Sequence, residues 1–245
     1  MIEIKLIKDG DLKGATFIEG FPGLGLVGPM AVSYIIDKLD MKYIGYIESD
    51  DFPPIITIHD SKPYPPVRLY FSDKKGIVAA FAEFAVPMPL IKELSQRLFD
   101  FIKEKKIAQI ISIGGMPSKG PDDKEIYAIA STPDALKMAQ KDGLDAVVEG
   151  VSAGVSALLL FESASEGVPD INLLVPIDPT VIDPKYAETA ITGINKLLNL
   201  NIDVTELEKE AKEVEDKIQT MLKKSKETHD NYKDAVNRGS PSMYA

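Results

Sequence analysis

The sequence predicts an α/β fold, a three-layer α/β/α domain with a mixed central sheet. Over the first two hundred residues, short apolar runs alternate with segments whose apolar residues recur at helical spacing, as expected for strands and helices in turn. The run Ile107–Ile113 is largely apolar, which is typical of a buried strand. A chain of 245 residues with 44% hydrophobic residues has ample material for one core.

The amino-terminal half is predicted to begin with two strands, separated by the turn signal Asp9-Gly10. A helix over Pro29–Leu39 follows, because its apolar residues share one face. Several prolines then punctuate the next strands and argue for irregular connections before a second amphipathic helix, Leu90–Lys105. The strands predicted in this half are Ile2–Lys8, Ala15–Glu19, Tyr43–Glu48, Ile55–His59, Val67–Ser72 and Ile77–Glu83.

The second half continues the alternation. Asp183-Pro184 is a good N-cap followed by a first-turn proline, which predicts a helix that begins there and ends at about Leu198. The other elements predicted here are strands Ile107–Ile113, Glu125–Ser131, Ala146–Glu149 and Ile171–Val175, and helices Pro133–Lys141 and Ser152–Glu162.

Charge and composition exclude several classes of function. Acidic residues outnumber basic ones 38 to 28, giving a net charge of −10, so nucleic-acid binding is not expected. The chain has no cysteine and two histidines, which excludes disulfides, thiolate catalysis and a Cys- or His-rich metal centre. No apolar stretch reaches membrane-spanning length and no signal-peptide pattern is present, so we expect a cytoplasmic protein that binds no membrane.

The last fifth of the chain has a different pattern. From Thr205 onward apolar residues recur near a/d spacing, and Thr205 with Glu208 forms a capping box, which predicts a long helix. Because a narrow apolar seam cannot be buried alone, this helix should pack on the body or on a second copy, and we favour a homo-oligomer. The predicted organisation is an α/β domain over 1–203, an amphipathic helix over 204–238 and a flexible tail over 239–245.

The glycine-rich segment Gly23–Gly28 fits the dinucleotide-binding pattern between a strand and a helix. In that interpretation, N–H groups at the helix start hold a pyrophosphate, and Glu48 or Asp50 binds a ribose. The alternative is a tight crossover that needs small residues for close packing. Pro22 and Pro29 bracket the segment, and Pro29 lacks an N–H that would have pointed at phosphate. We favour the structural interpretation and expect no cofactor.

The segment Gly150–Gly154 fits the nucleophile elbow of hydrolases, with Ser152 as the nucleophile. The only later histidine is His229, within the predicted long helix, while His59 stands alone at a strand end. The acids that follow Ser152 in suitable order are Asp170, Asp178 and Asp183. We favour a glycine-lined helix start and expect no catalytic residue.

The segment Gly114–Pro121 is predicted as a polar loop at the carboxyl end of a strand, where ligands bind in open α/β sheets. Lys119 with the nearby glycines could hold an anion there. A mobile surface loop, solvated by Asp122 and Asp123, is the alternative.

The carboxyl terminus reads Met243-Tyr244-Ala245, an apolar residue and a tyrosine before the terminal residue. On a flexible tether this is a plausible docking peptide. Its carboxylate can pair with a lysine or with backbone N–H groups, and the tyrosine ring can fill an adjacent slot.

These features together resemble one family. The segments Ile18–Gly28, Ile113–Pro117 and Gly150–Gly154 are similar to those of the proteasome assembly chaperone 2 family, and the long helix and tail resemble its archaeal members. The resemblance implies a fold like that of purine nucleoside phosphorylases, without an enzymatic site, in which a proline-bracketed glycine motif is structural. The matching motif residues are Pro22, Gly23, Gly25, Gly28, Gly114 and Gly115.

The resemblance also implies a function. Family members are ATP-independent chaperones that form homo-oligomers, here a tetramer or a pentamer. The tail is similar to the hydrophobic-Tyr-X tail of proteasome activators, so Met243, Tyr244 and Ala245 are expected to dock on α-subunits or the α-ring of the 20S core particle. A paralogous chaperone is a candidate further partner. The alternative function is a nucleotide- or phosphate-binding enzyme that uses the Gly23–Gly28 and Gly114–Pro121 loops.

Overall fold

The structure is a computed structural model of the chain, and it describes residues 1–8, 10–118 and 126–207. The predicted helix over 204–238, apart from its first four residues, and the predicted tail over 239–245 lie outside the described residues. The proposed division of the chain at residues 203 and 238 therefore stays a prediction.

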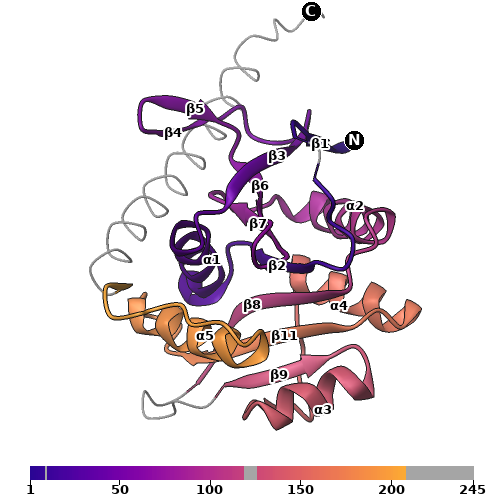
Figure 1. The fold of residues 1–245 in the computed structure, drawn as a ribbon, viewed down its shortest axis with the longest axis vertical. Helices are drawn as coiled ribbons and strands as arrows, with labels where there is room; N and C mark the ends of the chain where they lie inside the picture. Colours follow the sequence, from indigo (N-terminus) through magenta and orange to yellow (C-terminus); the bar gives the residue numbers. More distant parts are fainter. Residues whose placement is uncertain (9, 119–125, 208–245) are drawn as a thin grey trace, which may run out of the picture.

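In the described residues, nine strands form one mixed sheet in the order β1-β3-β6-β7-β2-β8-β11-β9-β10 (Figure 1). The first four strands of this order pair antiparallel, and β7, β2, β8 and β11 then run parallel. Strand β9 is antiparallel to β11, and β10 is parallel to β9. The strands are β1 (Ile2–Leu6), β2 (Thr16–Gly20), β3 (Lys42–Ser49), β6 (Val67–Ser72), β7 (Ile77–Ala82), β8 (Gln109–Pro117), β9 (Tyr127–Ala130), β10 (Asp145–Ala146) and β11 (Asp170–Ile177).

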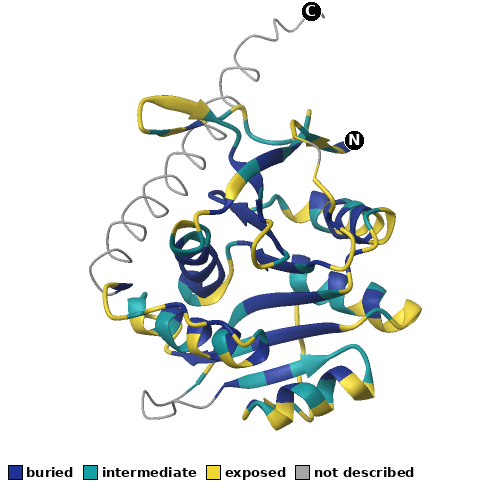
Figure 2. Ribbon diagram, in the orientation of Figure 1, coloured by how far each residue is buried: buried dark blue, intermediate teal, exposed yellow. Residues whose placement is uncertain are grey.

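Helices cover both faces of the sheet and enclose two cores. Side-chain alternation separates the cores: Ile18 of β2 packs into one and its neighbour Phe17 into the other. The first core also holds α1 (Val27–Lys38), α3 (Pro133–Lys141) and α5 (Pro184–Leu197), and the second holds α2 (Ile91–Glu104) and α4 (Val155–Glu166). Figure 2 shows the central strands buried between these helices. The three-layer α/β/α prediction is confirmed.

Local sequence signals explain where the helices begin. Asp183 caps α5 as predicted, because its Oδ1 accepts a hydrogen bond of 2.9 Å from the N–H of Lys185. Pro29 lies in the first turn of α1, where a missing N–H costs nothing, so α1 begins two residues earlier than predicted. Thr132 caps α3 in the same way through the N–H of Ala135.

Four elements differ from the predictions. Strand β8 continues to Pro117 instead of ending at Ile113, since Gly114–Pro117 pair with β11 residue by residue. The predicted strand Ala146–Glu149 is wrong beyond Ala146, because the chain leaves the sheet there. Helix α4 begins at Val155 instead of Ser152. The strand predicted over Ile55–His59 is shorter and joins an unpredicted strand in a separate hairpin, β4 (Thr57–His59) and β5 (Lys62–Tyr64). Proline is compatible with a strand in such a hairpin, where no central ladder is broken.

Candidate functional site

A cleft of about 860 Å³ lies near the carboxyl ends of the parallel strands, against the first turns of α2 and α4. Its walls come from the segments 21–24, 85–91, 113–117 and 147–156, and β9 and β11 contribute Ile129, Asn172 and Leu174. The three glycine segments that stand out in the sequence therefore meet at one place. Ligands of open α/β sheets bind in this position, and the volume is typical of a small-ligand pocket.

Glycines allow the backbone segments beside this cleft to approach closely. A Cβ on Gly115 would lie 2.5 Å from the carbonyl oxygen of Leu24, and a Cβ on Gly28 would lie 2.6 Å from that of Ile113. Real Cβ atoms do not approach that closely, so any other residue would push the turn before α1 away from β8. Gly25 has a φ of 66°, in the left-handed region that favours glycine.

The start of α1 is filled by protein rather than open to a pyrophosphate. Val27 and Gly28 are buried, and neither Gly25 nor Gly28 lines the cleft, whereas Pro22, Gly23, Gly114 and Gly115 do. The acids proposed for ribose binding are also far along the sheet, since β3 and the turn after it are separated from β2 by β6 and β7. The packing favours the structural interpretation of Gly23–Gly28.

Three polar side chains interrupt the otherwise apolar strands next to the cleft, and one of them, Asn172, lines it. Glu19, Ser112 and Asn172 are cross-strand neighbours on β2, β8 and β11, and each is at most 2% exposed. Burial raises the pKa of Glu19, while the hydroxyl of Ser156, the N–H of Phe21 and the hydroxyl of Ser112 act in the opposite direction. None of these three residues was expected from the sequence to be functional. The available signal was a single polar residue inside each apolar strand.

The rim of the cleft is apolar and exposed. Met88 is 80% exposed and Val148 is 89% exposed, and Leu24 and Val151 are exposed beside them. Glu149 is the one charged residue among the described residues that line the cleft. With no lysine, arginine or histidine in this described lining, the site is suited to an uncharged apolar group rather than to a phosphate or carboxylate.

The structure does not form the nucleophile elbow that the hydrolase interpretation requires around Ser152. Ser152 lies in an exposed eight-residue connection between β10 and α4, not in the sharp strand-to-helix turn that the motif requires. Asp170 begins β11 and Asp178 follows it, so these two acids lie at opposite ends of one strand. His229, like Lys119, Asp122 and Asp123, lies outside the described residues.

His59 has a structural partner at the β4–β5 hairpin. Its Nε2 lies 3.0 Å from the carboxylate of Glu83, which also pairs with the buried guanidinium of Arg68. That guanidinium lies over the rings of Tyr64 and Phe81, 5.4 Å from each centroid. The cluster therefore attaches the hairpin to the sheet.

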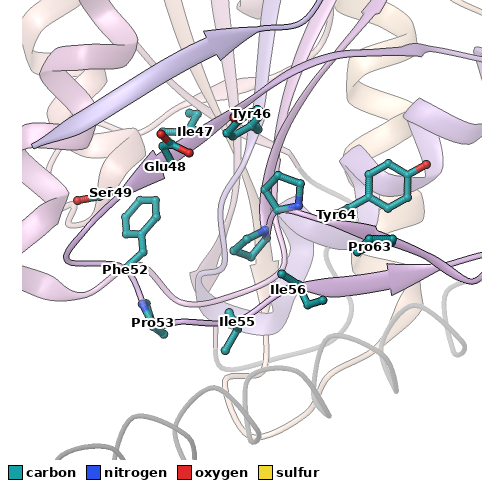
Figure 3. Close-up of a pocket in the computed structure, with 12 residues that line it drawn as sticks. Tyr46, Ile47, Glu48, Ser49, Phe52, Pro53, Ile55, Ile56, Pro63 and Tyr64 are labelled. Atoms are coloured by element: carbon teal, nitrogen blue, oxygen red, sulfur yellow. The ribbon is translucent and has the colours of Figure 1, made fainter.

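A second, smaller pocket of about 350 Å³ lies between this hairpin and β3 (Figure 3). The side chains of Phe52, Ile55 and Tyr64 line it together with four prolines. These prolines are Pro53, Pro63, Pro65 and Pro66. Ile56 on its edge is 65% exposed.

No group of three or more His, Cys, Asp or Glu side chains in the part that the structure describes could hold a metal ion. Among the described helices, none is long and apolar enough to cross a bilayer. The predicted docking residues Met243, Tyr244 and Ala245 lie outside the described residues.

The mixed sheet has helices on both faces, and a glycine-lined cleft lies near the carboxyl ends of its parallel strands. These features define a three-layer α/β protein. Within this class the chain belongs to the PAC2 family, whose model matches residues 17–222, and the family expected from the glycine motifs is thereby confirmed.

The chain is also similar to solved structures and to a curated relative. The fold is similar to Pyrococcus furiosus PbaA, described as an archaeal homolog of proteasome-assembly chaperone, with a TM-score of 0.83, 30% identity, and coverage of 93% of this chain and 100% of that chain. It is also similar to a Thermoplasma acidophilum protein of unknown function, with a TM-score of 0.82, 25% identity, and coverage of 91% and 92%. An uncharacterized protein of Methanocaldococcus jannaschii is 31% identical over 211 residues, covering 86% of this chain and 87% of the relative.

Proposed function

We propose that this protein is an ATP-independent, non-enzymatic proteasome assembly chaperone that docks on α-subunits or the α-ring through its carboxyl-terminal tail. The observation that carries the proposal is the 30% identity to PbaA, an archaeal homolog of proteasome-assembly chaperone, across 93% of the chain. Membership of the PAC2 family over residues 17–222 supports it. It acts in the cytoplasm, without nucleic acid or membrane.

The chemistry of the last three residues supports the docking mode. Met243 and the ring of Tyr244 supply apolar area, and the carboxylate of Ala245 supplies a charge that a lysine or backbone N–H groups can bind. One such tail buries little surface, so its own affinity is modest. In a homo-oligomer several tails act together, and the effective concentration of the second tail adds avidity of about 10²-fold or more.

The cleft lining supports independence from nucleotides. Phosphates are usually bound with the help of cations, and the described lining has no basic side chain. The start of α1, where the glycine motif would have held a pyrophosphate, is filled by protein. Reversible binding without ATP also suits a chaperone that must leave the assembled particle.

Native mass spectrometry with 20S proteasome α-subunits tests the proposal. The full chain is expected to bind, whereas a chain that ends at Ser242, or Tyr244→Ala, loses at least tenfold in affinity because the anchor is removed. Ser240→Ala alters the same tail outside the anchor and should bind like the unmodified chain. Equal binding by all variants would move the contact to the α/β body, and failure of the full chain to bind would refute the proteasome function.

The alternative, a nucleotide- or phosphate-binding enzyme, is tested separately. A ligand at a hundred times its Kd stabilises a protein by about 2.7 kcal/mol, which is easily seen as a rise in melting temperature. We expect no rise with NAD, ATP, nucleosides or phosphate. A rise with any of them, lost when Gly115 is replaced by Ala, would favour the enzyme.

A further inference from the structure

Buried polar atoms without a hydrogen-bond partner lie beside the glycine-lined cleft. Oδ1 of Asn172 is buried and has no hydrogen-bond partner within 3.5 Å in the described part of the chain. The same holds for Oγ of Ser112 and Oε1 of Glu19 on the neighbouring strands, although the Ser112 hydroxyl lies close enough to act on the Glu19 carboxylate. Of these three residues, Asn172 is the one that lines the cleft. Buried polar groups are nearly always paired, and each unpaired one costs free energy, so an unpaired one that lines a cavity indicates a group that is bound there.

The first turn of α4 offers complementary donors at the same place. Val155 and Ser156 line the cleft, and no side chain caps this helix at Gly154. The first N–H groups of a helix have no partner within it, so they can donate to a carbonyl oxygen in the cleft. The cleft therefore offers an acceptor from the sheet, Oδ1 of Asn172, and donors from the helix, which is the complement of an amide group.

The walls and rim determine what surrounds that amide. The exposed apolar side chains of Leu24, Met88, Val148 and Val151 stand at the mouth of the cleft, and its described lining has only Glu149 as a charged residue. Exposed apolar residues grouped around a cavity mark an interaction site. An acidic group would meet Glu149 with no described cation beside it, so the occupant carries no negative charge.

We propose that this cleft binds a short, extended, apolar peptide segment of a partner protein, which places a backbone amide on Asn172 and apolar side chains against the rim. A peptide satisfies both requirements at once, because its amides alternate with side chains. This binding goes beyond the docking of the tail and is measured with free peptides, so its outcome does not depend on binding to the proteasome.

Three peptides of one sequence test the proposal on the full chain. The probe is acetyl-Leu-Ser-Val-Ala-amide. A version with N-methylated peptide bonds keeps the apolar area but loses the N–H donors, and a version with a free carboxylate adds a negative charge. Binding is followed by NMR of methyl-labelled Leu24, Met88, Val148 and Val151. The neutral peptide should shift these methyl signals and bind about tenfold more tightly than either modified version.

Variants of the protein separate Asn172 from the rim. Asn172→Leu has similar volume and should weaken the neutral peptide about tenfold while leaving the N-methylated one unchanged. Met88→Ser and Val151→Ser change exposed residues, keep the fold, and should weaken all three peptides. Ile58→Ser removes an equally exposed apolar side chain from the β4–β5 hairpin and is the matched control, with no effect expected.

Several results would overturn the proposal. The proposal is wrong if the neutral peptide causes no methyl shifts at millimolar concentration. It is also wrong if all three peptides bind equally, or if the peptide with the free carboxylate binds most tightly. If the methyl signals instead shift with protein concentration alone, a second copy covers the cleft and the peptide assignment is wrong. If Asn172→Leu does not fold, the rim variants and the N-methylated peptide still decide the question.

Discussion

Replacing Asp170 by asparagine should change how the stability of the protein depends on pH. Asp170 lies at the start of β11, where its Oδ2 accepts a hydrogen bond of 3.1 Å from Ser163 and its Oδ1 has no partner in the described part of the chain. Burial, opposed by the hydrogen bond from Ser163 and assisted by the charge of Glu19, raises the pKa of this carboxyl from 3.8 to about 8. The folded protein therefore holds a proton on Asp170 that the unfolded chain has lost.

The magnitude follows from proton linkage. Between about pH 4 and pH 8 the folded state binds more protons at Asp170 than the unfolded state, so stability falls as pH rises, by about 1.4 kcal/mol per pH unit. Asparagine cannot ionise and removes this loss. The free energy of unfolding of Asp170→Asn, relative to the unmodified chain, should therefore increase by about 2.7 kcal/mol from pH 5 to pH 7.

Urea denaturation at pH 5, 6 and 7, at one protein concentration, measures this difference directly. Subtracting the unmodified chain cancels the titration of groups that both proteins share. Asp178→Asn is the control, because hydrogen bonds from Thr180 lower the pKa of Asp178 and place its titration below this pH range. A difference for Asp170→Asn that stays constant from pH 5 to pH 7 would refute the reasoning.

Two further predictions concern packing and charge. Gly115→Ala places a methyl group 2.5 Å from a backbone carbonyl oxygen and should lower the free energy of unfolding by about 1–3 kcal/mol. A Cβ at Gly23 meets nothing within 4 Å, so Gly23→Ala should change stability little. Equal melting temperatures for the two variants would contradict the close-packing argument. Arg68→Ala leaves the buried carboxylate of Glu83 without its guanidinium partner and should lower the free energy of unfolding by about 3–5 kcal/mol. Lys103→Ala breaks a half-exposed pair with Glu166 and should lower it by less than about 1 kcal/mol in the same urea assay. Similar losses for the two variants would argue against a buried pair at Arg68.

The sequence predicted the elements whose signals are local. The amphipathic period of α2 and the Asp183-Pro184 start of α5 are complete within one segment, so both lie within two residues of their predicted bounds. The apolar run beginning at Ile107 predicted β8, but its end was wrong. Gly114–Pro117 have low strand propensity and are extended because β11 pairs with them, which is a tertiary effect.

The cleft could not be predicted because it depends on strand order. The sequence singled out each glycine segment separately, but whether Gly23, Gly114 and Gly150 line one cavity depends on β2 lying beside β8. The same holds for the polar residues beside the cleft. Glu19 and Asn172 are 153 positions apart by number and become near neighbours only through their common partner Ser112.

The central position of β2 has a consequence for how the chain folds during synthesis. Strand β2 is among the first segments made, but its two partners, β7 and β8, follow about sixty and ninety residues later. Its apolar side chains Phe17 and Ile18 therefore leave the ribosome without a sheet to join, while β3, β6 and β7 can form a meander on their own. The growing chain must keep an early hydrophobic segment unpaired until β7 is complete, and open on one edge until β8 is complete, so this fold itself passes through a stage that is exposed to aggregation.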